Sequence, residues 1–505
     1  MSTIVATIAA IALATFGVVR GTWAVGGSDS SCYGLMAKAF ASGHLQPASA
    51  LAIDAPWPNA AITFAPGGFI PSTIRPDAAA PICAPGMSVL MAPLAAVFGS
   101  DAIFWLTPIA AAVLVFSSFV IARRLAGGMA GATAAILTAT SPIVMYQTVQ
   151  PMNDIVAAAL WLAAIACTGP AAGILIGLAI MVRPNLAPLA LVVAIIMAVQ
   201  QREGRLRAVG LMIAAALPGV IVMLWLNNAL YGGPFSSGYG AASRLFSTSH
   251  FQANLTNYSR AMFATQNIVP IFGVLAPLVF DGTKRVIASL LLLCAMVVIG
   301  IYLLYEPFPE WWYLRFLIPA LVLLLVLASA GATHVLSRAN MGGVIPLIAV
   351  VLGAFGVRAA GTHDVFALQA MEGRYRETAQ LVRDRLPANA VLITEWQSGS
   401  IQFHAGREVV LWESLDPAWL DRAVTWLKAK GLQPYILVER REEQPFRARF
   451  RSQSEIGGLD WPPRFDLNRQ ARIFDPADRA RYLAGEAYAT EQVGYPRRTQ
   501  SPRKM

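Results

Sequence analysis

Long apolar runs separated by short polar breaks dominate the first 360 residues of the chain. The first run, residues 4–19, has no basic segment before it and a polar flank, Arg20, after it, so we interpret it as a retained membrane span and not as a cleaved signal. Ten further runs predict about eleven membrane-spanning helices, although several are shorter than the roughly 20 residues that a straight span needs. These runs lie at residues 102–121, 126–145, 155–167, 171–182, 186–199, 208–225, 268–280, 286–304, 316–330 and 344–357.

After residue 364 the pattern changes to short helical and extended segments in alternation. Alternation of this kind indicates a parallel sheet, so residues 365–450 are predicted to form a small soluble α/β domain. Residues 451–505 are polar and rich in Arg and Pro, and we expect a partly disordered tail, with disorder at 495–505. The expected elements are helices at 376–385, 398–404 and 417–430 and strands at 390–395, 408–412 and 434–439.

Within the predicted transmembrane domain, residues 1–360, a long segment at 21–85 forms the first outer loop. It is rich in Pro and Gly, and a loop of this length in a compact protein is usually functional or disordered. Its large apolar side chains favour segments that lie in the membrane interface; these are Trp57, Phe64, Phe69 and Ile70. The apolar stretch 83–99 is short for a span, and we expect an interfacial or re-entrant helix there.

The composition is that of a membrane protein. Of the 505 residues, 56% are hydrophobic and 13% are charged, whereas soluble domains have about 25% charged residues. Most of the charged residues lie after residue 364, and mean hydropathy is +0.56. The net charge of +10 is not gathered into a basic stripe, so nucleic acid is not an expected partner. The sequence also lacks a Gly-rich nucleotide-binding loop of either standard pattern.

Basic residues in alternate short loops predict the orientation. With the N-terminus inside, these loops face the cytoplasm, as the positive-inside rule requires. The same orientation places the first outer loop, the 151–154 turn, the 227–267 loop and the C-terminal domain outside the membrane. The basic residues in question are Arg123, Arg124, Arg202, Arg205, Arg207, Lys284, Arg285 and Arg338.

Two carboxylates lie at the outer ends of apolar runs. Asp29 follows the first span and begins an amphipathic helical stretch that Gly43 ends, and Asp154 opens the run at 155–167. Ionisable residues at membrane depth are costly and tend to face a cavity, which favours a functional site. The alternative is structural: Ser28 or Asp29, and likewise Asp154, would be the N-caps of their helices.

Two arginines are expected at the same outer face. Arg183 lies in a tight Arg-Pro-Asn connection between two runs, and Arg315 follows an aromatic Trp-Trp-Tyr-Leu stretch. A guanidinium can hold a lipid phosphate through two parallel hydrogen bonds. The alternative is that each arginine extends to the lipid headgroups as an anchor.

The order of these features resembles the GT-C superfamily of polytopic glycosyltransferases, in particular bacterial members similar to protein O-mannosyltransferases and the lipid A aminoarabinose transferase. The resemblance covers about residues 1–360 and implies a GT-C-like helical fold. The motifs that carry it are Asp29 with Tyr33 and Gly43, Ala84-Pro85-Gly86, Asn153-Asp154, Arg183-Pro184-Asn185, Tyr231-Gly232-Gly233-Pro234 with Ser237-Gly238-Tyr239, and Arg315-Phe316-Leu317-Ile318-Pro319.

The resemblance implies a transferase of the bacterial inner membrane that moves a sugar from a polyprenyl-phosphate donor. The acceptor would be a hydroxyl of a glycan, lipid or protein on the outer face. Asp29 would be the base of a single inverting displacement, with Asp154 in support. The family often has a second acidic residue in this loop, where the chain has Ser30 and Ser31, so a divalent cation stays an open expectation.

Further residues are expected at the same site. A sugar or acceptor pocket is expected at Tyr33, Lys38 and Tyr239. The donor phosphate is expected to be held by Arg183, Arg315, Arg244 and Arg75.

Two other functions stay open: a transporter or flippase of lipid-linked sugars, and a non-catalytic scaffold that presents the C-terminal domain. A transporter would favour inverted repeats, and the sequence shows no such symmetry.

Cys32 and Cys83 share the outer loop and could form a disulfide in an oxidising compartment. The five His residues have no metal-ligand spacing.

Overall fold

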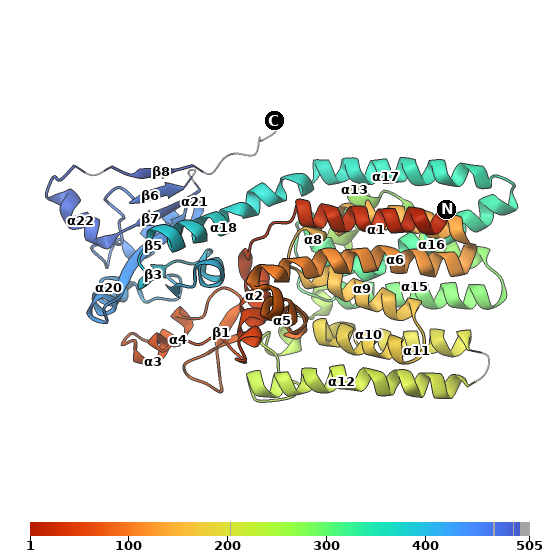
Figure 1. The fold of residues 1–505 in the computed structure, drawn as a ribbon, viewed down its shortest axis with the longest axis horizontal. Coiled ribbons are helices and arrows are strands. Elements are labelled where there is room, and N and C mark those ends of the chain that lie inside the picture. Colours follow the sequence, from red (N-terminus) through yellow and green to blue (C-terminus); the bar gives the residue numbers. More distant parts are fainter. Residues whose placement is uncertain (202–203, 468–469, 488, 495–505) are drawn as a thin grey trace.

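A bundle of apolar helices and a separate β-sheet make up the two parts of the molecule (Figure 1). The computed structural model describes residues 1–494 except 202–203, 468–469 and 488. Arg202 of the expected inside loops and the expected disordered end, 495–505, therefore lie outside the described residues.

Six helical segments of the described chain are long and apolar enough to cross a membrane, and two sharply bent helix pairs raise this number to as many as eight. The bent pairs are α7 with α8 (Gly128–Ala139 and Pro142–Thr148, 60°) and η4–α13 with α14–η5 (Thr248–Gln266 and Val269–Val279, 108°). The six long segments are α1 (Ser2–Val19), η1–α6 (Ser100–Ala126), α12 (Arg205–Tyr231), α15 (Gly282–Leu303), η6–α16 (Trp311–Arg338) and η7–α17 (Gly342–Thr362).

Fewer than the expected eleven spans are found when the helices of the described chain are judged by their length and apolar composition. All eleven apolar runs lie in helices, but several of these helices contain only 12 to 14 residues. At 1.5 Å per residue, such a helix is shorter than the hydrocarbon core of a bilayer. The short apolar helices are α5 (Gly86–Phe98), α9 (Asn153–Ala166), α10 (Gly169–Val182) and α11 (Leu189–Gln200).

The C-terminal part contains a six-stranded sheet in the order β4-β3-β5-β7-β6-β8. The expected strands at 390–395, 408–412 and 434–439 overlap β3, β4 and β5, which are parallel. The expectation of an all-parallel sheet is wrong, because β5 pairs with β7 and β7 with β6 in antiparallel register. The strands are β3 (Ala390–Ile393), β4 (Glu408–Val410), β5 (Gln433–Glu439), β6 (Phe465–Leu467), β7 (Ala471–Phe474) and β8 (Glu491–Val493).

Residues 465–493 also differ from the expected polar tail, because they add three strands and α22 (Pro476–Leu483) to this structure. The strands contain only three or four residues, which is too short for a clear period-2 pattern. Their apolar side chains, such as Phe465 and Ile473, are buried in the same core as β3 and β5. The remaining helices are α18 (Leu368–Arg385), α20 (Leu420–Ala429) and α21 (Arg440–Phe450).

The first outer loop packs against the sheet, so the expectation that Trp57 and Phe64 lie in the membrane interface is wrong. Both side chains are buried in the core that β3, β4 and β5 share with α20 and α21. The Leu411 amide donates to the Thr63 carbonyl, which ties the loop to the end of β4. The loop contains α2 (Gly27–Ala41), α3 (Leu51–Asp54), α4 (Ala60–Thr63), β1 (Phe69–Pro71) and β2 (Ala79–Pro81).

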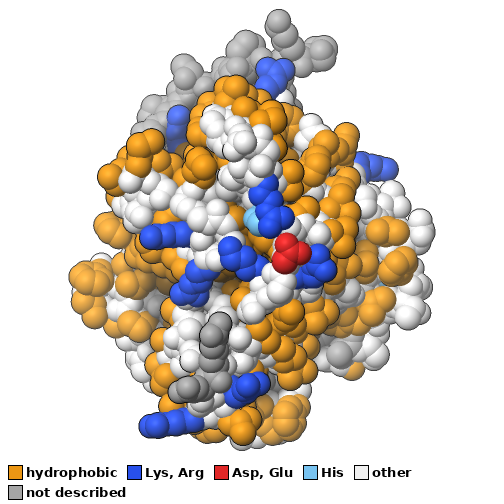
Figure 2. Space-filling view, turned by 90° about the vertical axis from the view of Figure 1, so that its right-hand side faces the viewer, with side chains coloured by type: hydrophobic (Ala, Val, Ile, Leu, Met, Phe, Trp, Pro, Cys, Tyr) orange, Lys and Arg blue, Asp and Glu red, His pale blue; other side chains and the backbone are white. Residues whose placement is uncertain are grey.

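The two ends of the bundle differ in chemistry. The sheet and α2 lie at one end, and the N-terminus and the short loops lie at the other (Figure 1). Figure 2 shows basic side chains spread over the short-loop end with few acidic ones among them. The exposed residues there include Arg123, Arg124, Arg205, Arg207, Lys284, Arg285, Arg338 and Asp281. That this end faces the cytoplasm stays a prediction from the positive-inside rule.

Candidate active site

Asp29 lies in the first turn of α2 and is not the cap of that helix. The N-cap is Gly26, with no side-chain cap hydrogen bond. Asp154 likewise follows the N-cap of α9, which is Met152 and also lacks a side-chain cap. The capping alternative is therefore wrong for both carboxylates, and other contacts must account for them.

The first turn of α2 is held in place from two sides. A disulfide joins Cys32 to Cys83, so the expected pairing is present. Gly68 packs against the same turn with φ +89°, and a Cβ at that position would lie 2.2 Å from the Ser28 carbonyl oxygen. Only glycine allows both this backbone conformation and this close approach. The backbone around Asp29 is thereby fixed before any ligand binds.

Arg315 of η6 forms an ion pair with Asp29, with Nη2 2.8 Å from Oδ2. The Asp29 side chain is 35% exposed, whereas that of Arg315 is 12% exposed. The carboxylate can therefore still meet a ligand from solvent while the guanidinium is largely enclosed. Because Arg315 is largely enclosed and paired with Asp29, the alternative that it anchors to lipid headgroups is wrong.

A second ion pair lies deeper, between Arg183 and Asp154. Arg183 Nη2 is 2.6 Å from Asp154 Oδ1 and 3.0 Å from Asn153 Oδ1. The Asp154 side chain is fully buried and that of Arg183 is 9% exposed, so the anchor alternative is wrong here too. Arg315 Nη1 lies 3.9 Å from Asp154 Oδ2, which links the two pairs into one cluster of two carboxylates and two guanidiniums.

The cluster keeps hydrogen-bonding capacity that the protein does not use. Arg183 Nη1 and Arg315 Nε are buried and have no hydrogen-bond partner among the described residues. Arg315 Nη1 makes only long contacts, 4.0 Å to the Met152 sulfur and 3.9 Å to Asp154 Oδ2. Buried donors without partners are rare in native proteins and call for an explanation such as a bound ligand. Donors on two adjacent guanidiniums suit an anion that has several oxygen atoms, such as a phosphate.

Aromatic rings surround the guanidiniums. The Arg183 guanidinium lies 5.5 Å from the Phe316 ring centroid and 5.8 Å from that of Tyr302. Arg315 lies 5.0 Å from Phe316 and 5.3 Å from Tyr313. Tyr302 is oriented by Asn185, whose Nδ2 donates to the Tyr302 hydroxyl over 2.9 Å. These rings hold the positive charges by cation–π attraction and exclude water from one side of the cluster.

Two tyrosines of the expected sugar pocket lie near Asp29. Burial raises the pKa of Tyr33 and of Tyr239 well above the usual value, and the nearby Asp29 carboxylate raises each further. Both hydroxyls therefore stay protonated at neutral pH. Tyr33 is buried at 3% exposure, whereas Tyr239 is 40% exposed, so Tyr239 is the more accessible donor.

The arrangement of helices and sheet is similar to that of several solved structures. ArnT from Cupriavidus metallidurans bound to undecaprenyl phosphate has a TM-score of 0.56 and 12% identity over 87% of this chain and 94% of its own. The Archaeoglobus fulgidus oligosaccharyltransferase in complex with Zn and sulfate has a TM-score of 0.55 and 13% identity over 89% of this chain and 70% of its own. AglB from Archaeoglobus fulgidus, in complex with an inhibitory peptide and a dolichol-phosphate, has a TM-score of 0.52 and 12% identity over 90% and 72%.

ArnT, an aminoarabinose transferase, and AglB are glycosyltransferases of the GT-C superfamily. The chain has the GT-C fold. The protein is thus a multi-pass membrane protein of GT-C architecture. No protein-family model matches the chain, and no curated protein sequence matches it.

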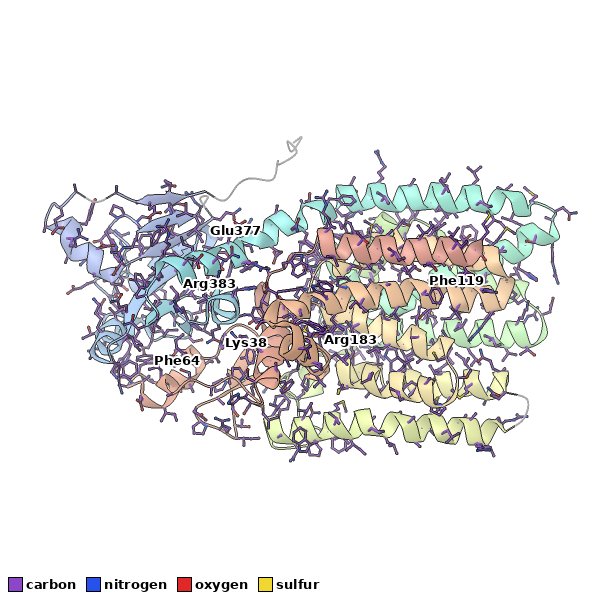
Figure 3. All side chains as sticks on the ribbon, in the orientation of Figure 1. Lys38, Phe64, Phe119, Arg183, Glu377 and Arg383 are labelled. Atoms are coloured by element: carbon purple, nitrogen blue, oxygen red, sulfur yellow. A yellow bond between two sulfur atoms is a disulfide. The ribbon has the colours of Figure 1, made fainter. Side chains whose placement is uncertain are left out.

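Within the GT-C fold, three of the expected site residues lie away from the Asp29 cluster. Lys38 donates to the Phe403 carbonyl of the C-terminal part over 3.3 Å, and Figure 3 shows Lys38 nearer the C-terminal part and Arg183 nearer the helical bundle. Arg75 pairs with Asp77 over 2.6 Å in an exposed turn of the outer loop. Arg244 is exposed in the segment that precedes α13. The fold brings the expected residues Arg183, Arg315, Asp29 and Asp154 into one cluster, with Tyr33 and Tyr239 near it.

The cluster does not suit a divalent cation. Its two carboxylates, Asp29 and Asp154, each face a guanidinium within 2.8 Å, and a cation between them would meet these positive charges. Hard cations prefer several oxygen ligands. No group of three or more His, Cys, Asp or Glu positioned for a metal lies among the described residues.

Some site residues in the GT-C fold were not predicted from the sequence. Tyr302 and Tyr305 lie at the end of α15 and in the segment after it, where tyrosines are typical of an interfacial belt. Tyr302 stacks on Phe316 with centroids 5.1 Å apart, and Tyr305 meets the same ring edge-on at 5.3 Å. The one available signal was the i, i+3 spacing of the two tyrosines, which places them on one side of a turn.

Proposed function

We propose that the protein is a membrane glycosyltransferase that moves a sugar from a polyprenyl-phosphate donor to a hydroxyl of an acceptor on the outer face of a bacterial inner membrane. The observation that carries the proposal is the Asp29 cluster. It combines one accessible carboxylate, two enclosed guanidiniums with unused donors, and aromatic walls at one end of an apolar bundle. The GT-C fold supports the same activity.

The proposed chemistry is a single displacement. The acceptor oxygen attacks the anomeric carbon, the bond from that carbon to the phosphate oxygen breaks, and the configuration inverts. The acceptor proton goes to the Asp29 carboxylate, and the electron pair of the broken bond leaves on the lipid phosphate. Proton transfer to a positioned base typically contributes about 10²–10⁴-fold to the rate.

Arg183 and Arg315 have the second role, which is to hold the phosphate. Charge builds on the leaving phosphate in the transition state, and donors already in place stabilise it without reorganisation. The free Arg183 Nη1 and Arg315 Nε are such donors. Arg315 also contacts Asp29, so one side chain links the base to the leaving group.

Asp29 is a better candidate for the base than Asp154. The Asp154 side chain has no exposed surface and its charge is balanced by Arg183, so an acceptor hydroxyl from solvent would not reach it. Asp154 is a positioning residue in this proposal, because it holds Arg183 in its place. Asp29 keeps 35% of its side chain exposed and lies where the outer loop meets the bundle.

The structural neighbours support the donor class. ArnT binds undecaprenyl phosphate in its structure, and AglB binds a dolichol-phosphate. A polyprenyl-phosphate sugar needs a site at the membrane surface where a lipid tail can lie beside the protein, and the Asp29 cluster is at one end of the bundle.

The test is a transfer assay with purified protein in lipid nanodiscs. A panel of polyprenyl-phosphate hexoses, pentoses and amino sugars is offered with an envelope extract as acceptor. We expect free polyprenyl phosphate to be released in equal amount to the sugar transferred. Movement of an intact lipid-linked sugar across vesicles, with no release of lipid phosphate, would instead support a flippase.

A further inference from the structure

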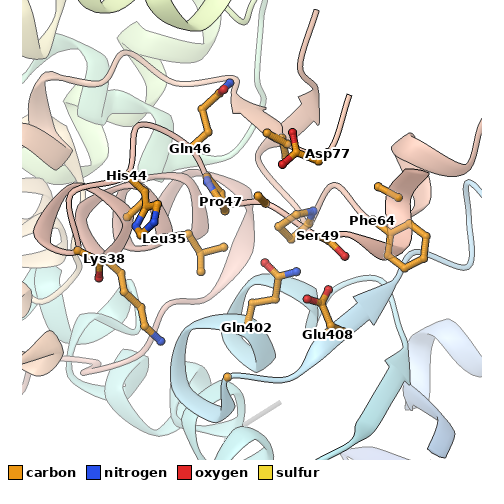
Figure 4. Close-up of a pocket in the computed structure, with 18 of the residues that line it drawn as sticks. Leu35, Lys38, His44, Gln46, Pro47, Ser49, Phe64, Asp77, Gln402 and Glu408 are labelled. Atoms are coloured by element: carbon orange, nitrogen blue, oxygen red, sulfur yellow. The ribbon is translucent and has the colours of Figure 1, made fainter. Parts of the chain in front are cut away.

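A cavity of about 460 Å³ lies between the first outer loop and the C-terminal sheet, separate from the Asp29 cluster. Its walls come from the second half of α2, from the loop at residues 42–49, from α3 and α4, and from the segment that leads into β4. Figure 4 shows the Ser49, Gln402 and Glu408 side chains directed toward one another in it. Each wall belongs to a different part of the chain, so the cavity exists only in the folded protein.

The cavity contains polar atoms that the protein leaves without a normal hydrogen bond. These atoms are Ser49 Oγ, Glu408 Oε2 and Arg407 Nε, and all three are buried. Ser49 is only 8% exposed, and its hydroxyl lies near the Glu408 carboxylate without reaching good hydrogen-bond geometry. A buried polar atom without a partner is costly. Three such atoms around one cavity indicate a ligand with polar groups.

We propose that this cavity binds a saccharide, namely a part of the acceptor that lies away from the reacting hydroxyl. A sugar hydroxyl can donate to Glu408 Oε2 and at the same time accept from Ser49 or Arg407. Gln46 and Gln402, which also line the cavity, provide amide groups that both donate and accept. This inference rests on the proposed function, because the bound saccharide is part of an acceptor only if the protein transfers sugar.

Electrostatics favours an uncharged ligand. Burial raises the pKa of Glu408 and lowers the pKa of Lys38, so the cavity weakens both charges that face it. Asp77 is already paired with Arg75, and Arg407, the remaining cationic side chain of Lys or Arg in the wall, donates from Nη1 to the Ala405 carbonyl. The wall thus carries two carboxylates and two cationic side chains and no cluster of a single sign, which does not favour a phosphorylated or strongly ionic ligand. Small apolar side chains such as Ala39 and Ala79 leave room for the C–H faces of a sugar ring.

The position of the cavity fits a remote part of an extended acceptor. Asp29 is in the first turn of α2, and Leu35, Lys38 and Ala39 of the same helix form the cavity wall. At 1.5 Å per residue, the wall lies about 9–15 Å along α2 from Asp29. One rigid helix therefore connects the two sites. Binding energy from a remote group can position the reacting hydroxyl at Asp29.

The first test is binding. Full-length detergent-solubilised protein is applied to a printed array of defined di- to tetrasaccharides, neutral, amino and acidic. We expect binding to neutral or amino saccharides, a loss of about tenfold or more in Glu408→Ala, and loss in Ala39→Phe, which fills the cavity. Glu413→Ala is the matched control, since Glu413 is exposed after β4. Melting temperatures show whether each variant is folded.

Three binding results would overturn the saccharide assignment. These are no array binding by the wild type, equal binding by Glu408→Ala and Glu413→Ala when both are folded, or binding of an immobilised peptide library in place of the saccharides. The Asp29→Asn variant should bind the array like the wild type, because Asp29 does not line the cavity.

The second test is kinetic and separates this inference from the proposed function. In the transfer assay, Glu408→Ala should raise the KM for the acceptor about tenfold while kcat changes less than about twofold, since it removes uniform binding. Reduced kcat with unchanged KM would overturn the acceptor role. If the wild type transfers no sugar but still binds the array, the proposed function fails and the saccharide site stands. If the wild type transfers sugar but the cavity variants behave like wild type, the saccharide site fails and the proposed function stands.

Discussion

Arg315 donates a hydrogen bond from Nη2 to the Asp29 carboxylate over 2.8 Å, although 286 positions separate the two residues along the chain. The pair joins the first turn of α2 to the start of η6–α16, the most buried of the six long apolar segments of the described chain. It also links the accessible carboxylate to a guanidinium that has unused donors. The contact therefore connects the proposed base with the proposed phosphate site.

Asp29→Asn should lower turnover by about 10²-fold or more, because an amide cannot take the acceptor proton. Asn can still accept the hydrogen bond from Arg315, so the protein level and donor binding should be kept. The measurement is kcat for transfer with purified protein. The matched control is Asp281→Asn, which removes an exposed carboxylate paired with Arg285 at the other end of the bundle. Normal transfer by Asp29→Asn would end the proposed mechanism.

Arg315→Lys should weaken the use of the donor, since a point ammonium does not reproduce a two-donor grip on a phosphate. We expect the KM for the donor to rise, and the same change at Arg183 should act in the same direction. Arg244→Lys and Arg75→Lys should have smaller effects, because these residues lie away from the cluster. The measurement is donor titration at saturating acceptor. If Lys at both main positions supports normal transfer, the two arginines have only a structural role.

Asp154→Asn should act mainly on stability. Asp154 is fully buried and paired with Arg183, and removing one partner of a buried ion pair typically costs about 3–5 kcal/mol. We expect a clear fall in the melting temperature, in contrast to Asp29→Asn, whose side chain is partly exposed. The measurement is thermal unfolding in detergent for both variants. Equal melting temperatures would show that the ion pair adds little to stability and that hydrogen bonds such as the one to Asn153 Oδ1 are enough to hold Arg183.

The disulfide should be essential for the shape of the outer loop. It closes a loop of 51 residues, and removing a disulfide of this kind typically costs about 2–4 kcal/mol. The double variant Cys32→Ser/Cys83→Ser should melt at a lower temperature, whereas Cys167→Ser, which changes a free cysteine, should not. Alkylation of the denatured but unreduced protein, followed by mass measurement, should label two of the four cysteines, because Cys294 is buried in the folded state. Labelling of all four would contradict the pairing.

The orientation in the membrane can be tested with a reporter that is active only in the cytoplasm. Fused after Met505 it should be silent, and inserted near Gly204 in the basic loop before α12 it should be active. These positions leave the sheet intact, whereas a fusion after Arg451 would remove β6, β7 and β8. The opposite pattern would reverse the topology and place Asp29 on the cytoplasmic side.

Much of the helical part could be predicted from the sequence because it depends on local pattern. Each apolar run became a helix, since a backbone in hydrocarbon must satisfy its own hydrogen bonds. Asp29, Asp154, Arg183 and Arg315 stood out for the same reason, because a charge beside a long apolar run is costly unless it is paired. The number of spans was harder, because a run of 12 to 14 residues has the same composition whether it crosses a bilayer or ends within one.

Tertiary structure alone decided which of these charges meet. Four candidate arginines looked alike along the chain, and only packing buried Arg183 and Arg315 beside carboxylates while Arg75 paired with Asp77 in an exposed turn. The same is true of Trp57 and Phe64, whose burial depends on a sheet more than 300 residues away in the sequence. Hydrophobicity determines that such side chains leave water, but it does not specify whether lipid or a protein core receives them. That choice depends on long-range packing, which a local pattern does not contain.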